Sequence, residues 1–173
     1  NFGIRVDQAL TDDRWLRISL DGRFNDAADL GIGGYNLPER AYSSSSSSYL
    51  LRLHERGPVG QRMYSESRLQ LSWISSASQA AIEQPTIVVN DAFTAGGAQV
   101  KGGQDTFEIY ASSDLDYVRG AQSFRFGVLL EGGRYRSNNI SNYLGTYTFA
   151  SLDDFSAGKP SKYSRQVGDP AVT

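Results

Sequence analysis

The chain has 173 residues, a formal net charge of −2 and no cysteine. This length is sufficient for one domain with its own apolar core, so neither disulfides nor a metal ion are needed to explain folding. The basic residues are scattered rather than gathered in runs, which argues against a nucleic-acid-binding surface.

No segment reaches the roughly 18 consecutive apolar residues of a membrane-spanning helix. A membrane-spanning strand needs only about 9–11 residues, of which alternate ones are apolar, so strands that cross a membrane remain possible. Glycine, serine, tyrosine and phenylalanine are plentiful and methionine occurs once, a composition typical of β-proteins.

The first 24 residues alternate apolar and polar side chains in two runs. Phe2, Ile4 and Val6 share one parity, and a second run with the same two-residue period extends from Leu16 to Phe24. The polar residues 11–13 separate the runs. The sequence therefore predicts a β-hairpin with a tight turn.

The same alternation predicts four further strands, over residues 49–56, 68–73, 107–117 and 124–136. They form two more hairpins, with short glycine-containing turns at 57–60 and 119–122. A tract of six serines at 43–48 can bury little apolar surface, so we expect it to be mobile.

Long polar segments at 25–48, 76–104 and 137–173 follow the three hairpins. Short turns that alternate with long loops are typical of outer-membrane barrels, whose periplasmic turns are brief and whose outer loops are extended. The expected fold class is all-β, an antiparallel meander that supplies about six or seven strands of a larger transmembrane barrel. The long segments are then extracellular loops.

The polar parity of these strands carries many charged residues, which suits a wall that faces a water-filled lumen. Its candidate lumen-facing cations are Arg17, Arg52, Arg68 and Arg125. These arginines would either hold a plug domain through charge pairs or hydrate the lumen wall. We favour the second role, hydration of the wall. Antiparallel sheets of soluble proteins alternate in the same way, so a soluble secreted β-sandwich with a binding or adhesion role is the alternative.

Catalytic and metal sites lack their usual parts. His54 is the single histidine and there is no cysteine, so zinc sites and histidine-based triads are incomplete. The acidic pairs at 12–13 and 153–154 are explained by a turn and a loop, and the glycine-rich residues 31–34 lack a following Lys-Ser or Lys-Thr. We expect no enzyme, no catalytic residue, no metal and no cofactor.

Aromatic residues lie mostly near predicted strand ends or in the long segments, where membrane-interface girdles and ligand-contact loops place them. The side chains expected to contact a ligand are Tyr35, Arg40, Tyr42, Phe93, Tyr143 and Tyr147. Loops on a rigid barrel are where specificity varies.

Six stretches with a characteristic order and spacing cover nearly the whole chain. They are NFGIRVD at 1–7, GGYNLPER at 33–40, PTIVVNDAFT followed by GGAQ at 85–99, FRFG at 124–127, GTYTF at 145–149 and LDDFSAGKPS at 152–161. In this order they resemble TonB-dependent outer-membrane receptors of the Oar-like kind, which carry a carboxypeptidase-regulatory-like domain.

The resemblance implies a barrel of about 22 strands in the bacterial outer membrane. It also implies a plug that occludes the barrel, and TonB-driven import of a scarce nutrient of the siderophore, oligosaccharide or peptide class. The expected partners are outer-membrane lipid, TonB, the plug domain and an imported ligand, with no nucleic acid.

Some parts of that pattern are missing from this sequence. No TonB box, plug domain or closing strand with a C-terminal aromatic is recognisable. Six or seven strands cannot close a barrel of this class. We therefore expect residues 1–173 to be an early part of the barrel, which aggregates or pairs through its edges when the rest is missing.

Overall fold

A computed structural model describes residues 1–168 and 171–172 and shows an all-β chain. The described elements are β1 (Phe2–Ala9), β2 (Trp15–Leu30), η1 (Pro38–Arg40), β3 (Tyr42–Val59), β4 (Met63–Ala80), β5 (Thr86–Val89), β6 (Phe93–Gly96), β7 (Val100–Arg119), β8 (Gln122–Ser137), β9 (Ile140–Ser141), β10 (Thr146–Phe149), α1 (Leu152–Ser156) and β11 (Lys162–Ser164). Among these residues, no helix is long and apolar enough to cross a membrane.

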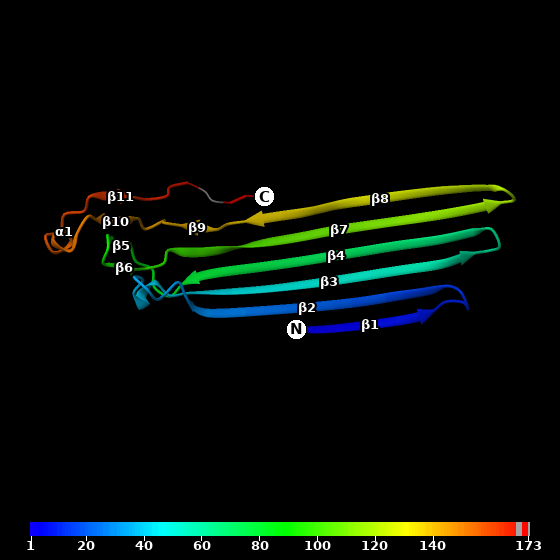
Figure 1. Cartoon of the computed structure of the whole chain (residues 1–173), viewed down its shortest axis with the longest axis horizontal. Helices are drawn as coiled ribbons and strands as arrows, with labels where there is room; N and C mark the ends of the chain where they lie inside the picture. Colours follow the sequence, from blue (N-terminus) through cyan, green and yellow to red (C-terminus); the bar gives the residue numbers. More distant parts are fainter. Residues whose placement is uncertain (169–170, 173) are drawn as a thin grey trace. The chain divides into compact units, whose positions relative to one another are not determined.

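The strands form two sheets (Figure 1). The larger one has the order β1-β2-β3-β4-β7-β8, and the short β9 pairs with β7. The smaller one has the order β11-β10-β5-β6. The antiparallel meander that the alternation predicts is therefore confirmed, whereas the parallel pairing of β10 with β5 was not predicted.

The chain divides into two compact units. Unit 1 comprises Asn1–Phe24, Ser47–Ile74 and Asp105–Tyr135, and unit 2 comprises Asn25–Ser46, Ser75–Gln104 and Arg136–Thr173. The three short turns, near residues 10–14, 60–62 and 120–121, all belong to unit 1. The three long segments belong to unit 2, apart from residues 47 and 48.

Unit 1 contains the three predicted hairpins. β1 and β2 pair with Ile4 opposite Leu20 and Val6 opposite Ile18, so apolar residues of the two strands share one face. The Leu10 amide donates to the Arg14 carbonyl at 2.7 Å and closes the first turn. Gly120, with φ of +60°, supplies the left-handed residue of the third turn.

The turn predicted at 57–60 is wrong in its position, because β3 continues to Val59 and the chain reverses after it. Gly57 has another purpose. A Cβ atom there would lie 2.6 Å from the Arg14 Cα, so the glycine permits close approach of the chain beside it. Arg14 then pairs with Glu55 at 2.5 Å.

The serine tract was predicted to be mobile, and this prediction is wrong. Residues 43–48 form the beginning of β3, paired with β4. The Ser78 hydroxyl donates to the Ser44 hydroxyl at 3.2 Å across the two strands. Backbone pairing and hydroxyl bonds order a segment that buries little apolar surface, because a sheet ladder satisfies its peptide groups regardless of side chain.

The predicted long loops also contain more structure than expected. Residues at the ends of these segments extend β2, β3, β4 and β7. Residues in the middle of the segments form η1, α1 and the four-stranded sheet. Periodicity missed the short strands β5 and β10 because four-residue runs such as TIVV and TYTF carry too little alternation to identify.

The two units differ in their cores. The buried apolar residues among those described are Ala41, Ala80, Val89 and Phe149. All four belong to unit 2, where the Phe155 ring of α1 lies 5.3 Å from Phe149 and 5.4 Å from Phe93. Unit 1, as described, has no buried large apolar side chain. It is a single layer.

A close backbone approach in unit 2 gives the first prediction. A Cβ atom on Gly97 would lie 2.6 Å from the Ile82 carbonyl oxygen and 2.7 Å from that of Gln84, both backbone atoms that cannot swing aside. We expect Gly97→Ala to destabilise unit 2 by about 1–3 kcal/mol, the usual range for overpacking. Hydrogen exchange of the Asn90 and Thr94 amides measures it.

Gly132→Ala is the matched control, because its Cβ would meet only an Ile109 methyl group at 3.6 Å. Equal exchange in both variants would contradict the packing around Gly97.

Candidate functional site

The four predicted lumen-facing arginines lie on one face of the unit 1 sheet. Each pairs with a carboxylate, in Arg17–Asp7 at 2.5 Å, Arg52–Asp21 at 3.0 Å, Arg68–Glu66 at 2.6 Å and Arg125–Asp116 at 2.6 Å. Most of these side chains remain substantially exposed. Exposed ion pairs add little to stability, so their main effect is to make this face wettable.

Side-chain contacts show that the arginines share this face. The Arg17 guanidinium lies 5.0 Å from the Trp15 ring, which contacts His54 at 5.0 Å. His54 pairs with Glu66 at 2.6 Å, and Glu66 with Arg68. This chain of contacts joins β2, β3 and β4. We name the surface the charged face.

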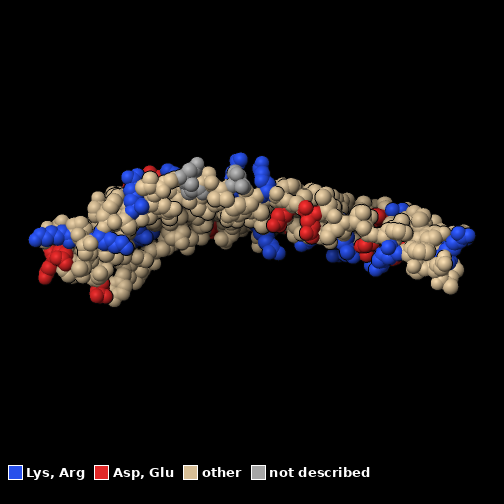
Figure 2. All heavy atoms as spheres, turned by 90° about the horizontal axis from the view of Figure 1, so that it is seen from above, with Lys and Arg blue, Asp and Glu red and all other residues tan. Residues whose placement is uncertain are grey.

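Aromatic contacts identify the opposite, apolar face. The ring centroid of Phe24 lies 6.2 Å from that of Phe2 and 5.5 Å from that of Tyr49, and the ring centroids of Trp73 and Phe107 are 5.4 Å apart. Asp116 has the opposite parity to Phe107 on β7, which places the Asp116–Arg125 pair on the charged face. Over unit 1 most blue and red atoms of Figure 2 lie along one margin.

The apolar face ends in a row of aromatic residues. Phe24, Tyr49, Trp73 and Phe107 come from four neighbouring strands, each at the boundary of its stretch of unit 1. The next residues of the same parity are polar, namely Asp26, Ser47, Ser75 and Asp105. Between this row and the turns, β2 carries Leu16, Ile18 and Leu20. We name this region of the face the apolar band.

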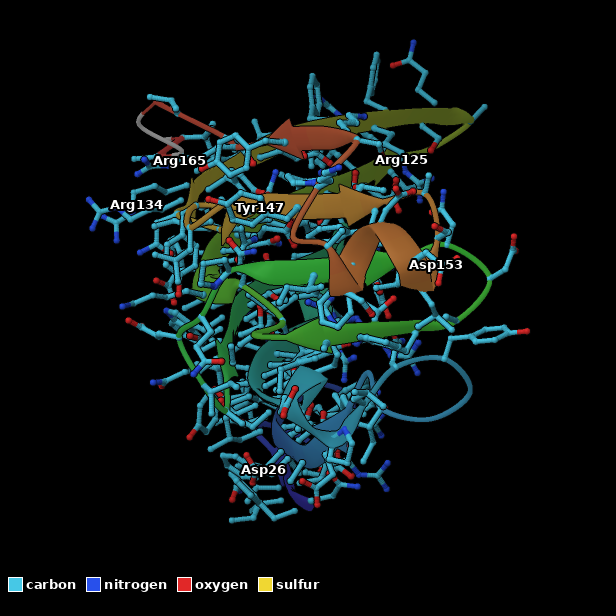
Figure 3. The ribbon with its side chains drawn as sticks, turned by 90° about the vertical axis from the view of Figure 1, so that its left-hand side faces the viewer. Asp26, Arg125, Arg134, Tyr147, Asp153 and Arg165 are labelled. Atoms are coloured by element: carbon cyan, nitrogen blue, oxygen red, sulfur yellow. The ribbon has the colours of Figure 1, made fainter. Side chains whose placement is uncertain are left out.

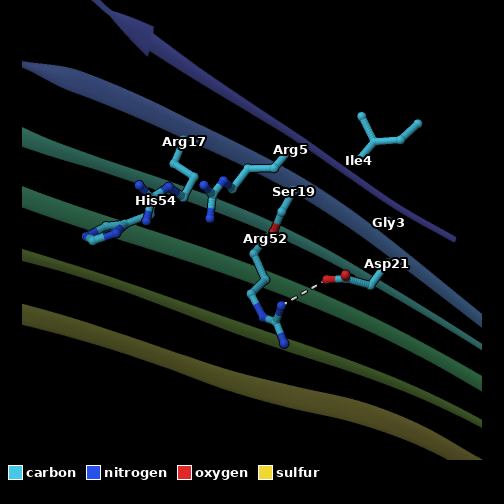
Figure 4. A pocket seen from close by; sticks show the side chains of 8 residues that line it. All are labelled: Gly3, Ile4, Arg5, Arg17, Ser19, Asp21, Arg52 and His54. Carbon is cyan, nitrogen blue, oxygen red and sulfur yellow. Dashed lines mark hydrogen bonds and ion pairs between the residues drawn. The ribbon is translucent and has the colours of Figure 1, made fainter.

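A cleft of about 510 Å³ opens on the charged face (Figure 4). Its polar lining comes from β1, β2 and β3 and consists of Arg5, Arg17, Ser19, Asp21, Arg52 and His54. Arg5 and Arg17 both approach Asp7, and Arg52 reaches Asp21. Since these cations are already paired, the cleft is a polar part of the charged face rather than a strong anion site.

Trp15 lies at a strand end, as predicted for an interface aromatic, but on the charged face. The guanidinium of Arg56 lies 4.6 Å from its ring and that of Arg17 lies 5.0 Å away. These are cation–π distances. Its odd parity, shared with Arg17 on β2, was the available signal in the sequence.

The residues predicted to contact a ligand all belong to unit 2, and they have different surroundings. Tyr35 is 69 % exposed. Tyr147, which Figure 3 labels, lies in the four-stranded sheet, and its ring contacts the tilted ring of Tyr163 with the centroids 4.8 Å apart. Tyr42 begins β3 and lies beside the backbone of Gly31. Phe93 packs against Phe155, so its ring belongs to the core of unit 2.

Arg40 takes part in a buried hydrogen-bond network around Thr86. Its Nη1 donates to Thr86 Oγ1 at 2.8 Å and also to the Gly97 carbonyl, while Thr86 Oγ1 donates to that carbonyl at 2.8 Å. Burial lowers the pKa of Arg40 from its usual value. The Glu39 carboxylate accepts from the Gly96 amide at 3.3 Å. Arg40 thus ties η1 to the end of β6.

Gln99 completes this network, and sequence reasoning did not find it. Its side chain is 2 % exposed, donates to Thr86 Oγ1 at 2.8 Å and to the Gly145 carbonyl at 2.7 Å, and accepts from the Leu144 amide at 2.7 Å. Its φ of +52° is uncommon for a non-glycine residue. Glutamine carries no pattern that predicts burial, so only the fold identifies this position.

Tyr143 lines a second cavity, of about 330 Å³, with Lys101, Ile140, Arg165 and Val167 among its neighbours. Lys101 pairs with Glu83 at 2.8 Å, and this hydrogen bond holds the pKa of the Glu83 carboxyl below its usual value. Burial, helped by the Glu83 charge, raises the pKa of Tyr143.

No group of three or more metal-ligating side chains occurs among the residues that the structure describes. His54, the single histidine, pairs with Glu66 on the charged face of unit 1. Comparisons with protein-family models, curated proteins and solved structures gave no match to this chain.

The Gln99 network gives the second prediction. Gln99→Leu removes three hydrogen bonds and leaves the Leu144 amide without its acceptor, at a cost of about 1–3 kcal/mol for that orphaned group, while the Gly145 carbonyl keeps the bond from the Thr86 amide. The amides of β5 and β10 should then exchange faster. The control is Gln61→Leu, at an exposed turn residue of unit 1. Unchanged exchange in Gln99→Leu would contradict the role of this network.

Proposed function

We propose that this chain is part of the wall of a bacterial outer-membrane β-barrel, in a transporter of the TonB-dependent kind. The observation that carries the proposal is the single-layer sheet of unit 1, which is apolar on one face and ion-paired on the other. In a barrel, the apolar face contacts lipid and the charged face lines the lumen.

The exposure of the apolar face supports this assignment. On β8 the alternate residues Phe126, Val128 and Leu130 are 61, 71 and 59 % exposed. Burying such a side chain contributes about 1.5–3 kcal/mol, so a row of them strongly favours an apolar neighbour. The aromatic row at the limit of the apolar band matches the girdle that barrels place at the membrane interface.

Dimensions support it further. The apolar band spans about nine residues of β2, from Leu16 to Phe24, close to the roughly 9–11 that cross a membrane. The strands β2, β3, β4, β7 and β8 are 16–20 residues long. Strands of soluble proteins usually have about 3–10 residues. Such length suits a barrel whose strands continue beyond the lipid.

The connections fit the same proposal, with the short turns of unit 1 on the periplasmic side and unit 2 outside the cell. Unit 2 would then capture a scarce nutrient of the siderophore, oligosaccharide or peptide class, while a plug and TonB act through the remainder of the full-length protein. The alternative is a soluble β-sandwich, in which a second sheet would cover the apolar face.

The two tryptophans give the third prediction, because they lie on opposite faces. In vesicles of brominated lipid that hold the intact protein, Trp73→Phe should reduce the fraction of fluorescence that the lipid quenches. Trp15→Phe should not lower the fraction of fluorescence that the lipid quenches. It should lower the fraction that acrylamide quenches from the aqueous phase. A protein that stays in the soluble fraction, with Trp73 shielded from both quenchers, would favour the sandwich.

Neighbouring residues of β8 give the fourth prediction. Val128 lies near the middle of β8 on the apolar face and Leu129 on the charged face, and both are exposed. Val128→Arg should destabilise the membrane-inserted protein by about 2–4 kcal/mol, the cost of a cation at the lipid midplane of a barrel, and Leu129→Arg by little. Urea unfolding in vesicles measures both. Equal effects would show that lipid does not contact the Val128 side.

A further inference from the structure

The cavity beside Tyr143 has the features of a built binding site. It lies within unit 2 and has a volume of about 330 Å³, at the lower end of the range for small-molecule pockets. Its wall is rigidly held, since the Gln166 amide donates to the Asn142 carbonyl at 3.0 Å and Ser141 bonds the Gln166 side chain at 2.9 Å.

Arg165 supplies an oriented cation. Its Nε donates to the Tyr143 carbonyl at 2.8 Å, which fixes the plane of the guanidinium and leaves the two Nη groups for another acceptor. No carboxylate in the part of the chain that the structure describes forms an ion pair with Arg165. A planar guanidinium in this state suits a carboxylate.

Tyr143 lines the cavity, and its buried hydroxyl lies beside the Glu83 carboxylate. Tyr143 therefore contributes its ring to the wall of the cavity. Lys101 contributes a second cation, offset by Glu83. The net charge of Lys101, Arg165 and Glu83 is therefore +1.

We infer that this cavity binds a small organic monoanion, a carboxylate on a short aliphatic body. The carboxylate contacts Arg165 and Lys101, and the aliphatic part contacts Ile140, Val167 and the Tyr143 ring. The inference deepens the proposed function, because it assigns a ligand class to unit 2. Binding itself requires no transport.

The test is calorimetric titration of isovalerate into the full chain in detergent micelles, with empty micelles subtracted. Isovaleramide, acetate and inorganic phosphate are compared under the same conditions. We expect saturable binding of isovalerate that is weakened about tenfold or more in the neutral amide and in Arg165→Gln. Acetate should bind more weakly than isovalerate, because it lacks the aliphatic body.

Lys162→Gln is the matched control, an exposed cation of β11 that does not line the cavity, and it should bind as the unaltered chain does. Hydrogen exchange of the β5 amides verifies that Arg165→Gln retains the fold of unit 2. Where that variant loses the fold, the comparison of isovalerate with its amide decides.

Each of the following results would overturn the inference. The acid and the amide bind with equal affinity, or folded Arg165→Gln has an unchanged Kd. Lys162→Gln loses as much affinity as Arg165→Gln, or phosphate or acetate binds more tightly than isovalerate. Failure of the two proposals is distinguishable. If the protein binds isovalerate but does not insert into lipid, the binding site is supported and the transporter proposal is rejected. If the protein inserts into lipid but does not bind isovalerate, the transporter proposal is supported and the binding site is rejected.

Discussion

The apolar face of unit 1 is largely exposed in the part of the chain that the structure describes, and the stability of this sheet depends on what covers it. A folded domain normally obtains its stability from such a face, because burial of apolar surface is the main favourable contribution to folding. Here the hydrogen-bonded ladder and the turns are present while that burial is missing. Lipid against the apolar band would supply it without a second protein layer.

Unit 2 satisfies the same requirement internally. Val89, Phe149 and the Phe155 ring form a small core, and Thr86 and Gln99 join separate segments through buried hydrogen bonds. Such networks specify one arrangement because each partner left alone would be an unsatisfied buried group. A segment that periodicity predicts as loop thus has fixed geometry, which a binding surface needs in order to hold its side chains in position.

The sequence was sufficient to predict the six main strands and the common face of the four arginines named as lumen-facing. Side-chain parity is a property of the strand itself, so the grouping of Arg17, Arg52, Arg68 and Arg125 needed no tertiary information. The structure of unit 2 was beyond such reasoning. Its sheet pairs β5 with β10, which lie far apart in sequence, and Gln99 owes its role to a left-handed backbone that no local pattern indicates. The serine tract was misjudged because backbone pairing determined its structure rather than composition.

An ion-paired charged face is compatible with both a barrel lumen and the outside of a soluble sandwich, so it cannot distinguish them alone. The apolar face distinguishes them better. A sandwich requires apolar residues wherever the second sheet packs. Here the next residue of the same parity beyond Phe24, Tyr49, Trp73 and Phe107 is polar on each strand, although β2, β3, β4 and β7 continue. An apolar layer of finite thickness, bounded by aromatic rings at one level across four strands, is the profile of a bilayer. The aromatic row therefore favours lipid as the missing cover.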